Sequence, residues 1–178
     1  MVRHGEAAAR WGVSADPGLS EAGLREAEQA ALEIRPTLAP DTLLISSPLR
    51  RAWQTAQPLA HLLQADILED SVFREIPAPV PLQQRQGWLQ QFMRQQWIEQ
   101  ADDLKLWRAT IMRRLLAMEQ PAVVFTHFLV INAVVGQVLG RDETLCCFPA
   151  NGSITRFRHC GDGLELLALG RQMQSVVN

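Results

Sequence analysis

Hydrophobic residues recur every three or four positions in several segments of the chain, which is the spacing of one face of an α-helix. The first such segment follows Ser20 and stops before Pro36. Serine favours the position that caps a helix, and proline cannot continue one. The pattern therefore predicts an amphipathic helix between these two residues. Its hydrophobic positions are Leu24, Ala27, Ala31 and Ile34.

Two short hydrophobic runs are each followed by a helical pattern. Residues 41–46 have the length of a strand, and after them Ser47 suits a helix cap, with Pro48 at the first helical position. Residues 121–125 form a continuous hydrophobic run, which is typical of a strand covered on both faces. A mostly buried helix that ends at Gly140 is expected after it. Each region thus predicts a strand that leads into a helix.

The remaining segments give weaker but still distinct patterns. Three prolines in residues 76–81 exclude a helix there and favour an extended connector. The glutamine-rich segment 82–120 follows the helical period, and we expect two helices in it, broken near residues 101–103. Near the end of the chain, two strand-like runs flank Asp162 and Gly163, which is a typical signal of a β-hairpin.

Strands that alternate with helices favour an α/β fold. We expect a three-layer sandwich with a mostly parallel sheet and helices on both faces, and 178 residues favour one domain over 1–178. Only Met1 and Val2 precede Arg3, so either the first strand is unusually short or the sequence begins inside a longer chain. In such a sheet the ligand binds outside the carboxyl ends of the strands.

Composition and charge narrow the classes of partner. With 17 Lys and Arg against 19 Asp and Glu, the formal charge is −2, so no global field attracts nucleic acid or an acidic membrane surface. No hydrophobic run approaches the roughly 20 residues of a membrane-spanning helix. The three cysteines lack metal-ligand spacing, and no leader precedes the first motif. We therefore expect a soluble protein of the reducing cytoplasm.

Arginines and histidines follow three of the predicted strands. Arg3 and His4 close the first strand, Arg51 lies in the first turn of the helix after the second, and His127 follows residues 121–125. An arginine fork binds two oxygens at once, a helix start favours anions, and a neutral histidine offers a nucleophilic nitrogen. If these side chains converge at one sheet edge, they form a phosphoryl-transfer site with two histidines.

The segments VRHGE, LSEAGLREA, SSPLRRAWQTA, FREI, VVFTH and NGSIT occur in this order over most of the chain. In residues and order they resemble the motifs of the histidine phosphatase superfamily, which is also called phosphoglycerate-mutase-like. The resemblance implies that His4 accepts the phosphoryl group as a phosphohistidine. It also implies that Arg3, Arg51 and His127 hold the phosphate oxygens, and that no metal and no cofactor take part.

The resemblance assigns two further residues. Glu75, in FREI, matches the acid of the family, which protonates the leaving oxygen and then helps to activate water. The nearby cationic groups should lower the pKa of Glu75 and a phosphate dianion should raise it, and we expect activity to peak on the acidic side of neutrality. Phe128 stands where family members usually have a glycine, but its backbone N–H can still bind phosphate.

Three functions remain open from the sequence. The leading prediction is a metal-independent phosphatase that hydrolyses phosphomonoesters, because the long insertion typical of the mutases is not evident. The alternatives are a cofactor-dependent phosphoglycerate mutase-type phosphotransferase and a catalytically weak protein that binds a phospho-ligand or regulates. A phosphorylated small molecule is the expected substrate, with a phosphoprotein as the other option.

Four aromatic residues lie in the segment that follows the proline-rich connector. They could line the site as a hydrophobic wall, but core packing or a contact between the subunits of a homodimer is the favoured interpretation. The residues are Trp88, Phe92, Trp97 and Trp107.

Overall fold

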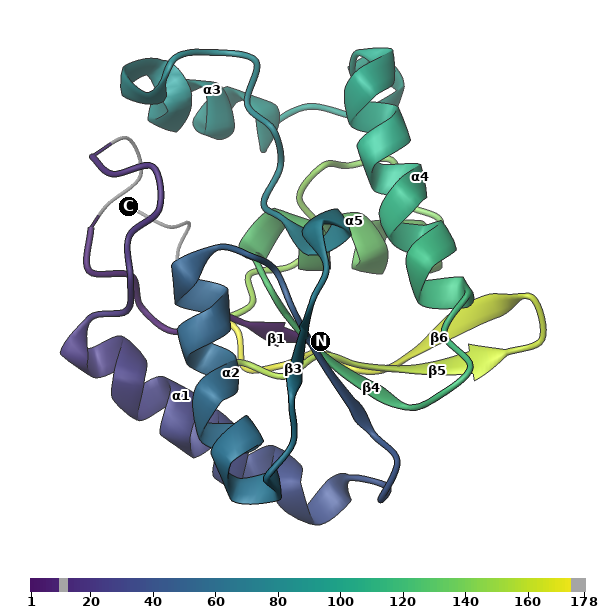
Figure 1. Ribbon diagram of the computed structural model, residues 1–178. Helices are drawn as coiled ribbons and strands as arrows, with labels where there is room; N and C mark the ends of the chain where they lie inside the picture. The colour runs from purple at the N-terminus through teal and green to yellow at the C-terminus, as the bar shows by residue number, and fades with distance from the viewer. Residues whose placement is uncertain (10–12, 174–178) are drawn as a thin grey trace.

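The computed structural model of the protein describes residues 1–9 and 13–173. At its centre lies a parallel four-stranded sheet with the strand order β1-β4-β2-β3 (Figure 1). The strands are β1 (Val2–Arg3), β2 (Leu43–Ser46), β3 (Ile67–Glu69) and β4 (Ala122–Thr126). Strand β1 has two residues.

Helices cover both faces of this sheet (Figure 1). They are α1 (Glu21–Ile34), α2 (Arg50–Leu63), α4 (Asp102–Leu116) and α5 (Phe128–Val138). Successive side chains of a strand point to opposite faces, so Leu44 packs with α1 and α2, whereas Ile45 packs with α4 and α5. Likewise, Val123 packs with α1 and α2, and Val124 packs with α4 and α5. The predicted three-layer α/β sandwich is confirmed.

The beginnings of α1 and α2 differ in how well the sequence predicted them. Ser20 caps α1 as expected, because its hydroxyl accepts the N–H of Gly23 at 3.0 Å. The prediction for α2 was wrong: Ser47 is not its cap, and the helix begins at Arg50 after Leu49 in an extended conformation. The Ser47 hydroxyl lies before the helix, where it accepts the Leu49 N–H and also forms a hydrogen bond with a histidine from another strand end.

The glutamine-rich segment forms a short helix, α3 (Arg85–Phe92), before α4. The second helix begins where expected, but the first ends well before residues 101–103, so this part of the prediction was wrong. Between the two helices the chain crosses to residues 142–143: the Trp97 N–H donates to the Asp142 carbonyl at 2.7 Å. The Trp97 side chain is buried there, and this packing outweighs the helical pattern.

The last two strands, β5 (Arg156–Cys160) and β6 (Gly163–Ala168), form the predicted antiparallel hairpin. Its two-residue turn is Gly161–Asp162, one position earlier than expected, because Gly163 already belongs to β6. Gly161 has a φ of 57°, which glycine adopts readily. The hairpin is a separate two-stranded sheet that packs beside α5.

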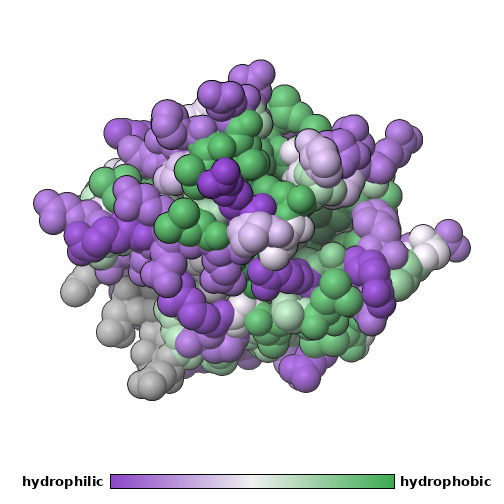
Figure 2. All heavy atoms as spheres, turned by 90° about the horizontal axis from the view of Figure 1, so that it is seen from below, coloured by the Kyte–Doolittle hydropathy of each residue, from purple (hydrophilic) through white to green (hydrophobic). Residues whose placement is uncertain are grey.

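On the face seen from below, hydrophobic and hydrophilic residues are interspersed (Figure 2). Large exposed hydrophobic side chains, such as Leu32 of α1 and Leu62 of α2, are common on protein surfaces and do not by themselves mark an interface. The homodimer therefore stays a prediction. Within residues 1–9 and 13–173, no helix combines the length and the hydrophobicity needed to cross a membrane.

Candidate functional site

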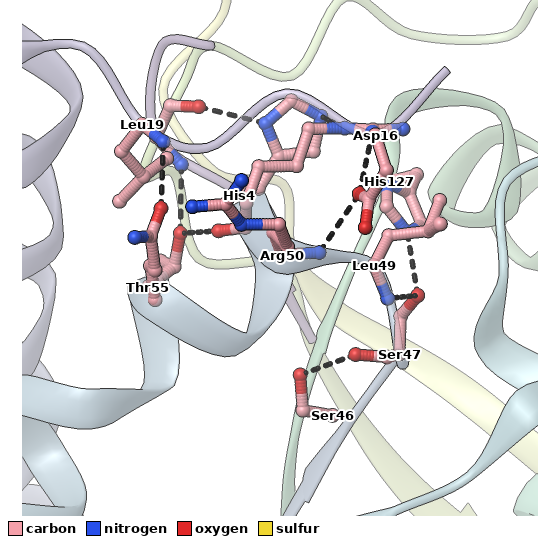
Figure 3. A network of polar contacts seen from close by, with 12 residues as sticks. His4, Asp16, Leu19, Ser46, Ser47, Leu49, Arg50, Thr55 and His127 are labelled. Carbon is pink, nitrogen blue, oxygen red and sulfur yellow. Dashed lines mark hydrogen bonds and ion pairs between the residues drawn. The ribbon is translucent and has the colours of Figure 1, made fainter. Parts of the chain in front are cut away.

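Two histidines meet at the carboxyl ends of neighbouring strands. The β1–β4 register pairs Arg3 with Thr126, so His4 and His127 follow side by side, and the His4 N–H donates to the Thr126 carbonyl at 2.9 Å. The centroids of the two imidazole rings lie 5.2 Å apart (Figure 3). Both side chains are buried. The sheet thus brings together the two histidines that the sequence analysis singled out.

One ring nitrogen of His4, Nε2, is unprotonated and carries a lone pair. Its Nδ1 lies 2.7 Å from the Gly5 carbonyl oxygen, which can only accept, so Nδ1 carries the proton. Its Nε2 accepts a hydrogen bond from Arg51 Nε at 3.1 Å. Burial, followed by the charges of Arg51 and Arg3, lowers the pKa of His4 well below its usual value of 6.5. The ring is therefore neutral, with a lone pair on Nε2.

His127 is oriented by a residue that the sequence analysis assigned to a helix cap. Its Nε2 lies 2.7 Å from the Ser47 hydroxyl, which also accepts the Leu49 N–H at 3.3 Å (Figure 3). Its Nδ1 is buried and has no hydrogen-bond partner among the described residues. Burial is the main cause that lowers the pKa of His127. When Ser47 donates to Nε2, the proton of neutral His127 sits on Nδ1, free for a ligand oxygen.

Two arginines flank the imidazole rings. Arg3 Nη1 donates to the Pro149 carbonyl at 2.7 Å, while Arg3 Nε is buried without a partner among the described residues. Burial lowers the pKa of Arg3 to about 10 and lowers that of Arg51, with burial again the main cause. Both guanidinium groups remain charged at neutral pH, and a buried anion beside them would be strongly favoured.

The start of α2 already has an anionic partner that the sequence analysis missed. The Arg50 N–H donates to Asp16 Oδ1 at 2.9 Å, and the same oxygen lies 3.9 Å from Arg51 Nη1 (Figure 3). The helix start was expected to offer its N–H groups to phosphate, but that of Arg50 is occupied. Asp16 lies in a loop with no periodic pattern, so no signal in the sequence placed it here.

Glu75 is buried, with its Oε1 accepting the Ile76 N–H at 3.1 Å. Burial raises its pKa, and this effect exceeds the opposing charges of Arg51, Arg85 and Arg3. The cationic groups therefore lower the pKa of Glu75 as expected, but burial raises it by more. A carboxyl that keeps its proton towards neutral pH is suited to be a general acid.

Phe128 and the aromatic set are mainly packing residues. Phe128 begins α5, so its backbone N–H has no acceptor within the helix, while its ring is fully buried and lies 5.1 Å from the Arg3 guanidinium carbon. Phe92 and Trp97 are buried in the same cluster, with Trp88 packed against it. Trp107 differs because it also lines a cavity. Core packing thus explains most of this set.

In the NGSIT segment, the turn supports the end of β1. The Gly152 N–H donates to the Arg3 carbonyl at 3.1 Å, and the Arg3 N–H donates to the Ser153 carbonyl at the same distance. Asn151 Oδ1 and Ser153 Oγ are buried without partners in the described part of the chain. Among residues 1–9 and 13–173, no His, Cys, Asp and Glu side chains cluster in a way that could hold a metal ion.

Comparisons with known proteins agree with the fold. The computed structure is similar to a phosphoserine phosphatase from Entamoeba histolytica in complex with 3-phosphoglyceric acid, with a TM-score of 0.72, 20% identity, and coverage of 96% of this chain and 95% of that one. A mycobacterial glucosyl-3-phosphoglycerate phosphatase in complex with inorganic phosphate gives a TM-score of 0.74 at 21% identity, covering 97% and 96% of the two chains.

Comparisons of the sequence add a relative and a family. A probable phosphoglycerate mutase GpmB from Proteus mirabilis is 36% identical over 92 residues, which are 48% of this chain and 40% of that relative. The sequence profile of the histidine phosphatase superfamily, branch 1, matches residues 1–172. Because that match covers nearly the whole chain, the protein belongs to the histidine phosphatase superfamily.

Proposed function

We propose that this protein is a metal-independent phosphatase that hydrolyses phosphomonoesters through a phosphohistidine on His4. The observation that carries the proposal is the Nε2 lone pair of His4, which accepts the Arg51 Nε–H beside the buried ring of His127. Membership of the histidine phosphatase superfamily supports the same chemistry.

In the first step, His4 Nε2 attacks the phosphorus atom. The N–P bond forms while the P–O bond to the leaving group breaks, and Glu75 transfers its proton to the leaving oxygen. Arg3, Arg51 and His127 stabilise the negative charge of the phosphoryl oxygens, which is the role that a bound cation has in many phosphoryl transferases. The raised pKa of Glu75 and the lowered pKa of His4 favour the protonation states that this step needs.

In the second step, water attacks the phosphohistidine. Glu75, now a carboxylate, takes a proton from the water as the new P–O bond forms and the N–P bond breaks. Inorganic phosphate leaves, and His4 is neutral again with its Nε2 lone pair restored. One carboxyl group thus serves as acid and then as base.

The expected substrate is a phosphorylated small molecule, with a phosphoprotein as the alternative. The phosphate oxygens would contact Arg3, His4, Arg51, His127 and the Phe128 N–H. A cytoplasmic location and the exclusion of nucleic acid and membrane partners stay predictions from the sequence.

The direct test is to mix the protein with p-nitrophenyl phosphate, to quench within the first turnover, and to map acid-labile phosphate by mass spectrometry. We expect the label on His4 and neither label nor turnover in His4→Ala. The control is His61→Ala, which changes an exposed histidine of α2 and should keep both. Folded wild-type protein without label and without turnover would remove the enzyme hypothesis and leave a phospho-ligand binding protein.

The name of the Proteus mirabilis relative favours a second candidate, phosphoglycerate mutase activity. The two candidates differ in where the phosphoryl group goes after His4, to water or to a second hydroxyl. Incubation with 3-phosphoglycerate, with product analysis by phosphorus NMR, separates them. Free phosphate as the main product supports the phosphatase, whereas 2-phosphoglycerate formed faster than phosphate selects the mutase.

A further inference from the structure

A cavity of about 560 Å³ lies beside the proposed acid. It is formed between residues 71–78 and α4, and Glu75 is part of its wall. A volume of this order holds a small organic molecule. Because Glu75 is proposed to protonate the leaving oxygen, a group that occupies this cavity is the part of the substrate attached to that oxygen.

Part of the cavity wall is hydrophobic. Trp107 and Leu106 come from α4, and Val72 and Ile76 come from the segment on either side of Glu75. The Trp107 ring stacks beside Trp97 with centroids 6.2 Å apart, which limits its movement. Such a surface favours a carbon skeleton over bare inorganic phosphate.

Two arginines, Arg74 and Arg85, also line the cavity. Arg85 is half-buried, and its Nη2 donates to the Ile76 carbonyl at 3.3 Å. Its charge reaches the reacting groups, because it contributes to lowering the pKa of both Glu75 and His127. Within residues 1–9 and 13–173, neither arginine forms an ion pair. Arginine charge that no carboxylate balances favours an anionic ligand.

Besides Glu75, the wall contains one other acidic residue, Asp103, which does not pair with these arginines among the described residues. Asp103 lies in the first turn of α4, where its Oδ1 accepts the Leu104 N–H at 2.8 Å. It pairs with neither Arg74 nor Arg85 in the described residues. Both arginines of the lining are therefore left without a carboxylate partner in the described part of the chain.

We propose that this cavity binds the leaving group of the substrate and that this group is a small carbon skeleton with a second anion, a carboxylate or a second phosphate, held by Arg85. The proposal rests on the proposed phosphatase function and narrows its substrate class. Arg85 is then a residue that determines specificity, with the exposed Arg74 adding positive charge nearby.

The test compares substrates of matched shape. The first pair is 4-(phosphonooxy)benzoate and 4-(phosphonooxy)benzamide, and the second is hydroquinone bisphosphate and 4-hydroxyphenyl phosphate. We expect the anionic member of at least one pair to have a kcat/KM about tenfold or more higher, the effect of one charge-assisted hydrogen bond. The first pair reports a carboxylate and the second a phosphate. Hydrolysis of all four without preference would overturn this proposal and leave the phosphatase standing.

Variants assign the preference to Arg85. Arg85→Gln should reduce the ratio of kcat/KM values within the preferred pair to about twofold, and Arg85→Lys should keep part of it. Arg94→Gln, just beyond α3 and outside the cavity wall, should keep the full ratio. Any effect of Arg85 on Glu75 changes kcat/KM for both members of a pair alike, because both use the same acid. It therefore does not change the ratio. A full ratio in folded Arg85→Gln would contradict the assignment.

Binding to His4→Ala separates this proposal from the proposed function. In calorimetry, the anionic member of at least one pair should have a dissociation constant at least tenfold lower than that of its neutral counterpart. This holds whether or not the wild-type protein hydrolyses it. If the wild-type protein hydrolyses none of the four but this difference in affinity is found, the phosphatase proposal fails and the anion site remains. If His4→Ala binds the members of each pair equally, the anion site is excluded.

Discussion

At the scale of single residues, burial decides which protonation states the site holds. Glu75 and His4 are both enclosed, and enclosure disfavours the charged form of either, so the pKa of the carboxyl is raised and that of the imidazole is lowered. The two shifts favour a protonated carboxyl and a neutral imidazole. These are the states that an acid and a nucleophile need in one reaction. The surrounding arginines reinforce the effect on His4 and oppose it on Glu75.

The pH dependence of kcat/KM follows from the directions of these two pKa shifts, because kcat/KM reports the titrating groups of the free enzyme. This ratio should fall as pH decreases through the lowered pKa of His4, because the nucleophile becomes protonated. It should also fall as pH rises through the raised pKa of Glu75, because the acid loses its proton. We expect a bell-shaped profile with its maximum on the acidic side of neutrality. Glu75→Gln should lower kcat for an alkyl phosphate by about 10²-fold or more.

The leaving group provides the control for the Glu75 prediction. p-Nitrophenolate leaves readily without a proton, so Glu75→Gln should reduce formation of the phosphohistidine from p-nitrophenyl phosphate much less than from an alkyl phosphate. Rapid-quench measurement of the two substrates checks this. Equal loss for both would contradict the role of Glu75 as the acid.

At the scale of elements, a close approach between the loop after β1 and helix α1 holds His4, the proposed nucleophile, in place. A Cβ on Gly5 would lie 2.9 Å from the Cα of Gly23 and still closer to its carbonyl oxygen. The Gly5 N–H also donates to the Thr55 hydroxyl of α2 at 3.0 Å. Two helices therefore fix the residue whose carbonyl oxygen accepts the His4 Nδ1 proton.

Gly5→Ala should reduce the free energy of unfolding by about 1–3 kcal/mol and shift His4 away from its productive position. Gly87 is the matched control, because it lies inside α3 and a Cβ there meets nothing within 4 Å. Gly87→Ala should leave activity unchanged and increase the free energy of unfolding by about 0.5–1 kcal/mol. Urea denaturation and kcat measure both effects. A Gly5→Ala protein with wild-type stability and rate would show that the loop can move without cost.

At the scale of the whole molecule, the site is built where several segments cross and is shielded from water. That arrangement has a cost in stability, because the folded protein holds His4 and His127 neutral and resists their protonation. The unfolded chain protonates both with a pKa of about 6.5. Stability should therefore decrease as pH falls through this value, since the unfolded state takes up protons that the folded state excludes.

Between pH 7.5 and 5.5, each of these histidines should reduce the free energy of unfolding by about 1.4 kcal/mol. Urea denaturation at the two pH values measures this decrease in the free energy of unfolding. In His127→Asn the decrease should be smaller than in the wild type by about 1.4 kcal/mol. The same change at the exposed His61 should leave the loss as in the wild type. A wild-type pH dependence in His127→Asn would mean that His127 is not held neutral in the folded state.

The sequence by itself predicted the order of strands and helices except for β3, which gave no recognised signal. It also predicted the cap of α1, the hairpin, and the placement of Arg3, His4, Arg51 and His127 at strand and helix ends. These features depend on local periodicity and on residue types at element boundaries, which are written along the chain. The same local signals failed at the start of α2 and at the end of α3, where contacts with distant segments outweigh them.

Only the tertiary structure decided how the site residues interact. The proton on His4 Nδ1, the contact of Ser47 with His127, the position of Asp16 and the raised pKa of Glu75 all depend on atoms from separate segments. The physical reason is that hydrogen bonds act over about 3 Å and desolvation requires enclosure from several sides. Neither can be read before the chain is folded.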